Sequence, residues 1–463
     1  MQGVSTMLVS AVFYVSLPFS LLRWLQEMPF CWRHMRTMEK GTQKDKIAKA
    51  ALDKYDELKK TGKPIPSQEW TVYTAIVMLN TKEEIVVALG TGSKCIGKTS
   101  LSSNGDTIND SHAEVIARRC FLKFLYSEMR KSVYEESICL NYKKDMAKFI
   151  LKDDITFHMF TTCLPCGDAT IFQVSPKYES NKFKKEIKVT PPLEKRLKTE
   201  TDTYSVDVND DNNEERETLV NFTDLNRTGA KCLPLGFQDP KLLGTQYHVI
   251  GVLRTKPGRG DPTLSMSCSD KIAKWNLLGV QGSLLSWFLE KPIYFSSIIF
   301  GKCRFNLDSV ERAIYGRFKN DLLDFVFPIG YRHNCPVIDV VDINRKELMK
   351  DDSIKPCSGS ILWYYGCKNQ EVAVEGKKQG VTKKLRNIGK ANLSVCKREL
   401  YHDYVNLKTA VSTEKFETVK LTYSEAKNLS VEYCKLWKDV RDRVFKIWSQ
   451  KPKHFEGFSI CEQ

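Results

Sequence analysis

The sequence predicts an α/β fold in which a β-sheet lies between two layers of helices. Three observations predict it. Strand-like and helix-like segments alternate along the chain, which is typical of layered α/β domains. The ends of these segments carry metal-binding residue types, with His112 and Glu114 opening a helix and Cys166 following a strand. The composition, with 42% hydrophobic and 27% charged residues, is that of a soluble globular protein.

The first elements are expected to be a helix and a β-hairpin. Residues 45–61 have helical periodicity and end at Gly62-Lys63-Pro64. Residues 70–78 and 84–89 are rich in β-branched and aromatic side chains on either side of a turn-like segment. The following Gly90-Thr91-Gly92-Ser93-Lys94 lacks the full spacing of a phosphate-binding loop.

The middle of the chain predicts a second helix and a strand, followed by an insertion. The helix runs from Ser111 to about Met129, and the strand covers residues 155–160. This strand leads Cys163 and Cys166 to what we expect to be a second helix start. From about 176 to 245 the sequence is a variable charged insertion, with a basic block before an acidic one and few large apolar residues.

Ordered structure is expected to return at residues 247–253, before a Gly/Pro-rich loop at 257–262 that leads to Cys268. We expect the later helices and strands in the following ranges: helices at 272–289, 307–318 and 423–448, and strands at 293–300 and 337–343.

The chain divides into two parts by composition. Residues 1–40 form an apolar N-terminal extension, and 41–463 are predicted to form one large domain. Val4 to Leu22 carries no charge and is long enough for a membrane span. We interpret it as an atypical or disordered start, with Met38 an alternative beginning. No membrane association is expected unless this segment is a real anchor.

Net charge and cysteine usage limit the function classes. The net charge of +15, with 71 basic and 56 acidic residues, favours a nucleic acid partner, although solubility alone could explain it. The 15 cysteines are odd in number and irregularly spaced, which argues against a secreted disulfide framework. We therefore expect an intracellular protein of the nucleus, the cytoplasm or both. Most other cysteines, such as Cys120, Cys303 and Cys396, are expected in the core.

The motifs predict a catalytic zinc site, which needs three protein ligands and leaves one position for water. His112 and Cys166 are clear candidates. A common deaminase pattern would place the third ligand where this chain has Ala169. Cys163 and Cys268 remain as alternatives for that ligand. Cys268 is preferred because a charged Asp-Lys pair follows closely and because of the resemblance given below.

Glu114 is the candidate proton carrier beside this metal. It lies two residues from His112, close enough to reach a water activated by zinc without binding the ion. In this role it takes a proton from the water that attacks the amino-bearing carbon of a base, and returns it as ammonia leaves. The alternative is structural, with His112 a satisfied helix-start histidine and Glu114 a first-turn acid favoured by the helix dipole.

Three motifs carry a resemblance to a known family: Asn109 to Glu114, Pro165 to Ala169, and Met266 to Ser283. Together they resemble the catalytic domain of the adenosine deaminases acting on RNA, from about Trp70 to Phe458 apart from the insertion. The resemblance implies a cytidine-deaminase-like zinc core elaborated into an adenosine-to-inosine editase domain. It also implies that Cys268 is the third zinc ligand.

Within the family the chain resembles the branch that makes inosine at position 37, next to the anticodon of alanine tRNA. Residues 1–69 leave little room for a separate double-stranded-RNA module, and the helix ending typical of that module is missing. The insertion also has no recognisable counterpart of the family's base-flipping loop. We therefore expect the anticodon loop of alanine tRNA as the partner.

The resemblance further implies a buried inositol hexakisphosphate. Tyr423, Lys427 and Tyr433 would share one arc of the helix predicted at 423–448. A buried polyanion would explain basic residues in core-like segments, although solvent exposure is the alternative. Asp110 and Lys271 are expected to link this ligand to the zinc site, and Trp437 departs from a lysine of some relatives. The expected ligand residues are Asn109, Arg118, Arg119, Lys271, Lys274, Trp275, Gln281, Lys397, Tyr423, Lys427, Tyr433, Trp448 and Lys451.

Three other functions compete with deamination of tRNA. The chain could edit double-stranded RNA, or it could deaminate free nucleosides, which would need fewer basic residues. It could also be an inactive RNA-binding or scaffold relative that keeps zinc only for folding. The intact Glu114 argues against the last, because a structural metal site has no use for an acid beside the ion.

Overall fold

The computed structural model describes residues 42–174, 224–258, 260–301, 304–382, 384–385, 391–412 and 421–460. The predictions for the apolar segment at 4–22, for the insertion up to residue 223 and for Cys303 lie outside these residues. The residues from Lys44 onward form one compact unit.

The strands of the described residues are β1 Glu69–Trp70, β2 Tyr73–Leu79, β3 Glu84–Thr91, β4 Ser93–Cys95, β5 Asp110–His112, β6 Leu140–Lys143, β7 Lys148–Leu151, β8 Thr156–Thr161, β9 Phe172–Val174, β10 Asp224–Asn226, β11 Lys231–Cys232, β12 Arg254–Thr255, β13 Phe295–Gly301, β14 Val337–Val341, β15 Lys355–Pro356, β16 Ser360–Tyr364, β17 Glu371–Val374 and β18 Lys377–Lys378. The α-helices are α2 Gln43–Glu57, α3 Ala113–Tyr134, α4 Cys268–Leu278, α5 Gly282–Ser286, α6 Leu307–Ile314, α8 Lys397–Val411, α9 Tyr423–Asn428 and α10 Val431–Val444.

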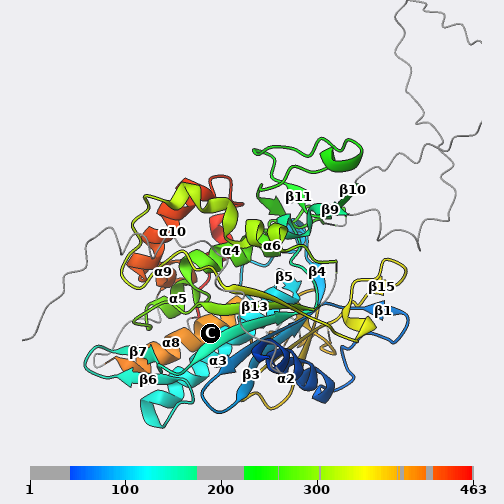
Figure 1. Ribbon diagram of the computed structural model, residues 1–463. Coiled ribbons are helices and arrows are strands. Elements are labelled where there is room, and N and C mark those ends of the chain that lie inside the picture. Colours follow the sequence, from blue (N-terminus) through cyan, green and yellow to red (C-terminus); the bar gives the residue numbers. More distant parts are fainter. Residues whose placement is uncertain are drawn as a thin grey trace, which may run out of the picture. The chain divides into compact units, whose positions relative to one another are not determined.

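The largest sheet of the described residues has eight strands in the order β14-β13-β8-β2-β3-β16-β17-β18. Figure 1 labels β13 and β3 of this sheet. Strands β14, β13 and β8 run parallel to one another, and the pairs from β8 through β2 and β3 to β18 are antiparallel. The parallel pairs depend on connections that cross the sheet, and helices in these connections cover its faces.

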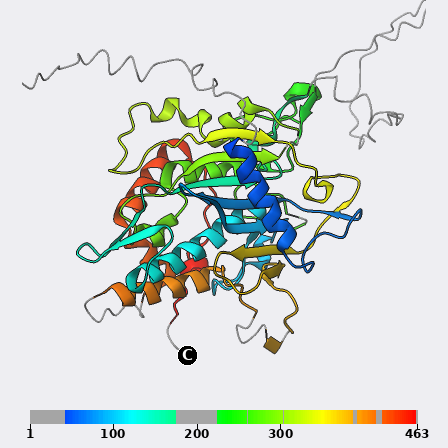
Figure 2. The ribbon, with the colours of Figure 1, turned by 60° about the horizontal axis from the view of Figure 1, so that its bottom comes forward.

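Both faces of the central strands are buried under helices, which makes the architecture three-layered. Along β2, Tyr73, Ala75 and Val77 face the cluster that includes α2, whereas Ile76 and Met78 face the cluster that includes α3 and α8. This alternation follows from the two-residue repeat of a strand. Figure 2 shows α2 lying across one face of the sheet. The predicted three-layer α/β/α fold class is therefore confirmed.

Close approach between α3 and β3 sets the position of the metal-binding helix. A Cβ at Gly90 of β3 would lie 2.6 Å from the Ile116 Cβ atom and 2.7 Å from the backbone nitrogen of Ala117. Only glycine allows α3 to pack this tightly on the sheet. The start of α3 is thus held at the edge where β3 ends.

The predicted β-hairpin, the helix at 111–129 and the strands at 155–160, 293–300 and 337–343 are confirmed within a few residues. Three predictions of longer helices were wrong. The helix at 272–289 begins earlier and divides into α4 and α5, and the helix at 307–318 ends at Ile314 and continues as a 3₁₀ turn. The helix at 423–448 divides into α9 and α10.

These breaks have local causes. Gly279 ends α4 with a φ of +77°, a conformation that favours glycine. Ser430 separates α9 from α10, and its hydroxyl donates to the Ser283 carbonyl at 2.5 Å rather than to its own helix. Consequently Tyr423 and Lys427 lie on α9 while Tyr433 lies on α10, so the predicted single helical arc was wrong.

Candidate metal centre and active site

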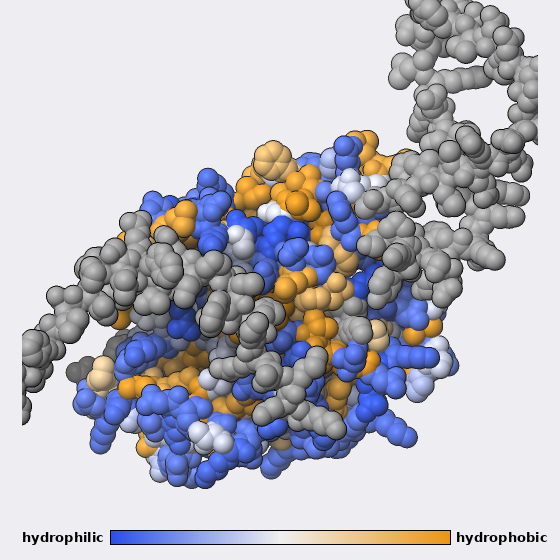
Figure 3. Space-filling model, in the orientation of Figure 1, coloured by the Kyte–Doolittle hydropathy of each residue, from blue (hydrophilic) through white to orange (hydrophobic). Residues whose placement is uncertain are grey.

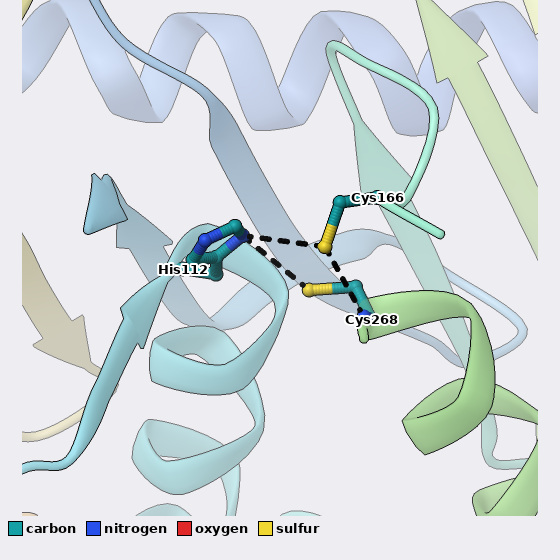
Figure 4. A group of neighbouring side chains, drawn as sticks. All are labelled: His112, Cys166 and Cys268. Atoms are coloured by element: carbon teal, nitrogen blue, oxygen red, sulfur yellow. Dashed lines mark hydrogen bonds between the residues drawn. The ribbon is translucent and has the colours of Figure 1, made fainter. Parts of the chain in front are cut away.

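Three side chains from separate segments converge on one point (Figure 4). His112 ends β5 immediately before α3, Cys166 lies in the loop after β8, and Cys268 is the first residue of α4. The Nδ1 atom of His112 is 3.8 Å from the Cys166 sulfur and 3.6 Å from the Cys268 sulfur. All three candidate ligand atoms lie within 4.8 Å of one another.

These separations fit a tetrahedral zinc ion. Zinc binds histidine nitrogen at about 2.0–2.1 Å and cysteine sulfur at about 2.3 Å, so tetrahedral angles require nitrogen–sulfur separations of about 3.6 Å. The observed distances of 3.6 and 3.8 Å agree with that requirement. One nitrogen and two sulfur donors also leave a fourth position, which is characteristic of catalytic rather than structural zinc.

The loop that carries Cys166 is shaped by contact with α4. Gly167 has a φ of +108°, and a Cβ there would lie 2.4 Å from the Ser267 hydroxyl oxygen. Ser267 caps α4 by accepting a hydrogen bond from the Asp270 backbone. The Cys166 sulfur in turn accepts a hydrogen bond from the backbone nitrogen of Cys268 at 3.3 Å. The helix terminus therefore holds the two cysteines together.

The two thiols do not ionise independently. The hydrogen bond with Cys268, together with Lys256 and His112, holds the pKa of the Cys166 thiol well below its ordinary value. Burial and the neighbouring Cys166 sulfur raise the pKa of Cys268 well above its ordinary value. Without an added cation the pair therefore retains a proton, and metal binding would release it.

Glu114 lies in the first turn of α3 and is almost completely buried. Burial raises the pKa of its carboxyl group, with His112 and Lys256 opposing the shift. A buried carboxyl group with a raised pKa can accept and return a proton near neutral pH. Glu114 is not part of the three-ligand group, but it is close enough to raise the pKa of Cys268.

Lys256 is a site residue that the sequence analysis missed. Its side chain is fully buried, and its Nζ atom lies 3.1 Å from the Cys268 sulfur and 2.7 Å from an Asp110 carboxylate oxygen. Asp110 also forms an ion pair with Lys271, the other residue expected to link the zinc site to the polyanion. Despite burial, Asp110 and the two cysteine sulfurs raise the pKa of Lys256 well above its ordinary value.

Only the structure distinguishes Lys256 from the other lysines. The Gly/Pro-rich loop folds back so that the Lys256 backbone nitrogen donates to the Ser265 carbonyl at 2.8 Å. A lysine at this point of a hairpin must face the segment that leads to Cys268. Neither the composition nor the periodicity distinguishes it from an exposed lysine.

Residues 88–452 match the family of the adenosine-deaminase (editase) domain. The chain belongs to the adenosine-deaminase (editase) family. A Drosophila melanogaster tRNA-specific adenosine deaminase 1 is 33% identical over 89% of this chain and 96% of that protein. The Homo sapiens tRNA-specific adenosine deaminase 1 is 30% identical over 89% of this chain and 99% of its own length. A Mus musculus double-stranded RNA-specific adenosine deaminase is 29% identical over 84% of this chain but only 30% of that protein.

Two expectations about this editase can now be compared with the structure. The helix expected after Cys166 was wrong, because the segment forms only a 3₁₀ turn at Asp168–Thr170. Cys163, the alternative third ligand, lies outside the three-ligand group, and its sulfur is 3.8 Å from the Leu348 carbonyl. Among the described residues, no helix is both long and apolar enough to cross a membrane.

The expected polyanion residues of the editase come together from several elements. Burial and the nearby Lys427 and Arg118 lower the pKa of Lys274 well below its ordinary value. Burial, Lys397, Lys271 and Arg119 likewise lower the pKa of Lys451 to about 7. The seven basic residues form what we call the cation cluster, which comprises Arg118, Arg119, Lys271, Lys274, Lys397, Lys427 and Lys451.

Polar groups in the cation cluster pair some of its members and leave one buried donor without a partner. Glu456 is the acid that bridges Lys397 and Lys427, at 2.8 and 2.7 Å. The buried Nε of Arg119 has no hydrogen-bond partner among the described residues. With its amide oxygen turned toward Lys451, Asn109 accepts a hydrogen bond from that lysine at 2.8 Å.

Aromatic rings line the same cluster. Lys274 lies 3.3 Å from the ring centroid of Trp437 and 5.3 Å from that of Trp448. Arg118 lies over Trp275, and Lys397 and Lys427 lie over Tyr423. Arg118 also lowers the pKa of Tyr433, which burial raises to about 12.

Gln281 differs from the other expected ligands of the polyanion. Its amide nitrogen donates to the Leu278 carbonyl and to Ser286, and its amide oxygen accepts from the Ile293 backbone. The amide is therefore committed to the turn between α4 and α5 rather than available to a ligand.

Proposed function

We propose that this editase hydrolyses adenosine to inosine in tRNA, in a zinc-dependent reaction, and that its substrate is adenosine 37 next to the anticodon of alanine tRNA. The observation that carries the proposal is the His112, Cys166 and Cys268 group beside a buried acid. The relatives named tRNA-specific support the substrate class, because the match extends over 96 to 99% of their length.

His112, Cys166 and Cys268 would hold the zinc ion. When bound, zinc supplies Lewis acidity that activates a water molecule. Glu114 takes a proton from this water as its oxygen attacks C6 of adenine, and gives a proton to the amino group that leaves as ammonia. Adenosine and water thereby become inosine and ammonia.

Lys256 and Asp110 would support the ligand set. Lys256 donates to the Cys268 sulfur, which stabilises the thiolate form that zinc requires. Asp110 fixes Lys256 and connects it to Lys271 of the cation cluster. A change in the cation cluster can therefore reach the metal ligand through three buried side chains.

We propose inositol hexakisphosphate as the ligand of the cation cluster. Seven partly buried cations that share the carboxylates of Asp110 and Glu456 are costly unless a polyanion compensates them. The unpaired Arg119 Nε and the lowered pKa of Lys451 and Lys274 support such a ligand. Mass spectrometry of the denatured protein should detect it. Lys451→Met should lower the amount that is retained, whereas Lys453→Met, at an exposed neighbour, should not.

The substrate is tested with four RNAs or nucleosides. Purified protein is incubated with alanine tRNA, the same tRNA with guanosine at position 37, a long RNA duplex and free adenosine, and inosine is measured in each. Inosine should form in the first only. Reaction of the duplex alone would overturn the tRNA proposal in favour of a double-stranded RNA editor.

The catalytic role is tested with Glu114→Gln. This variant should keep its zinc but lose turnover by about 10²- to 10⁴-fold, the range attributed to general acid–base catalysis. Metal content measured on the same preparation is the control. Retained turnover would remove Glu114 from the mechanism.

We also propose an intracellular location, in the nucleus, the cytoplasm or both. The support is chemical, because two of the ligands are cysteine thiols, which are oxidised to disulfides in an oxidising compartment. Fractionation of cells that express the tagged protein would test this, and recovery from the secreted fraction would contradict it.

A further inference from the structure

An ordered segment beside the metal loop exposes an unusual number of large apolar side chains. We call residues 233–250 the apolar loop. Leu235 is 89% exposed, Leu243 83%, Phe237 78%, Leu242 54% and Ile250 53%. In Figure 3 apolar surface gathers at the upper edge of the molecule, over the segment that follows β11. Clustered exposed apolar side chains mark an interaction surface more often than isolated ones do.

The apolar loop is held rigid by a buried ion network. Arg254 is completely buried and donates to both carboxylate oxygens of Asp239, at 2.6 and 2.7 Å, and to the Val249 carbonyl at 2.7 Å. His248 lies 2.9 Å from the same carboxylate. Gln238 donates to the carbonyls of Leu233 and Gly236 at 2.7 and 2.8 Å, which closes the turn that carries Leu235 and Phe237.

The base of the apolar loop is attached to the metal-binding loop on both sides. Before it, the Thr228 hydroxyl accepts a hydrogen bond from the Gly167 backbone at 3.2 Å. After it, the Gly251 backbone donates to the Asp168 carboxylate at 2.6 Å. Gly167 and Asp168 directly follow the ligand Cys166. The base of the apolar loop is therefore anchored to the segment that carries the metal ligand Cys166.

The charge on this segment favours an anionic partner. Lys231 and Lys241 are exposed. The exposed Arg227 pairs with Asp224 at 3.3 Å and stacks over Tyr247, with 4.0 Å between the guanidinium carbon and the ring centroid. The Asp239 carboxylate is neutralised by Arg254. Apolar and aromatic faces next to cations are the combination that binds unpaired nucleobases, because bases stack on the rings and the backbone pairs with the charges.

We propose that the apolar loop binds unpaired nucleobases of the RNA substrate that flank the target adenosine, with Phe237 as a stacking residue. This inference rests on the proposed function. The chain's own insertion is a poorer occupant, because large apolar residues are sparse between 176 and 223 and charged blocks dominate it. A docked protein would not require the loop to be attached to the metal-binding segment, whereas an RNA substrate must reach that segment.

The test uses the full chain and a fluorescently labelled anticodon stem-loop RNA. Phe237→Ala should raise its Kd at least about fivefold, since stacking on one base is worth about 1–3 kcal/mol. Phe237→Tyr, which keeps an aromatic face, should stay within about twofold of the wild type. The loss in Phe237→Ala should appear in the Kd and in KM.

Tyr134→Ala is the matched control. Tyr134 is an aromatic residue that is 71% exposed at the last position of α3, and His112 lies just before the first. A helix of 22 residues places these positions about 30 Å apart. This variant should bind RNA as the wild type does.

A Kd for Phe237→Ala within about twofold of the wild type would overturn the inference. Binding of another protein by the apolar loop would not rescue it. Hydroxyl-radical footprinting gives a second measurement, in which Phe237 should be labelled in the free full chain and protected by RNA. Protection without RNA would mean that another part of the chain covers it, which also overturns the inference. Inosine formation by the wild type reports the proposed function separately, so the two can fail independently.

Discussion

Replacement of Lys256 by methionine tests whether the buried lysine supports the metal ligand. The change removes the ammonium group that lies 3.1 Å from the Cys268 sulfur, and with it one of the two lysine partners of Asp110. Breaking a buried ion pair costs about 3–5 kcal/mol. Because Asp110 keeps Lys271, we expect a loss near the lower limit, about 3 kcal/mol, in the metal-free protein.

Zinc adds a second, separable effect. Loss of a partner that supports a ligand weakens metal binding by about 10- to 100-fold. A 10- to 100-fold weaker affinity reduces the part of the free energy of unfolding that saturating zinc contributes, by about 1.4–2.7 kcal/mol. Urea unfolding of Lys256→Met and wild type, in chelator and in excess zinc, should therefore show a larger difference in zinc than in chelator.

Lys123→Met provides the matched control for this experiment. Lys123 pairs with the buried Asp403 at 2.6 Å, and Arg130 remains as a second partner at 3.6 Å. The variant should lose stability by the same amount in chelator and in zinc. If Lys256→Met behaved in the same way, with an unchanged zinc affinity, the role assigned to Lys256 would be refuted.

Three further predictions concern the ligands, the metal loop and the cation cluster. Cys268→Ala should abolish zinc retention measured by metal analysis, whereas Cys163→Ala should retain it; equal metal contents would contradict the ligand assignment. Gly167→Ala and Gly366→Ala both place a side chain at positive φ, at a cost of about 1–3 kcal/mol, but only the former meets a neighbouring atom. Only Gly167→Ala should therefore lose zinc as well as stability. Because the pKa of Lys451 is lowered to about 7 in the folded protein, the unfolded chain binds more protons above that pH, and stability rises with pH from about 7 to 10. Urea titrations of ligand-free wild type and ligand-free Lys451→Met should show this difference. The free energy of unfolding of the wild type should rise by up to about 1.4 kcal/mol more per pH unit than that of the variant. The same pH dependence in both proteins would argue against a buried lysine.

Much of the layered fold could be predicted because its signals are local. The β-branched and aromatic residues of β2 and the helical repeat of α3 are visible in the sequence, and so are the ends at which His112 and Cys166 lie. The helix breaks could not be placed in this way. The end of α4 depends on the positive φ of Gly279, and the division at Ser430 depends on a contact with Ser283 that lies far away in the sequence.

The turn after Cys166 shows the same limit of local reasoning. The backbone nitrogen of Ala169 donates to the Ser269 hydroxyl at 3.2 Å, and Gly167 takes a conformation that no helix allows. A partner 100 residues away therefore decides this segment. Lys256 was missed for a related reason, because only its burial against Asp110 and Cys268 distinguishes it from a surface lysine.

The wide separation of the site residues along the chain has a consequence for biosynthesis. Ribosomal synthesis releases His112 long before Cys268, and Lys451 and Glu456 emerge last. Zinc capture must wait for more than half of the polypeptide, and the pairing of Lys397 and Lys427 with Glu456 in the cation cluster must wait for nearly all of it. A truncation shortly before Lys451 would thus keep every candidate zinc ligand and still yield a protein that cannot complete its interior.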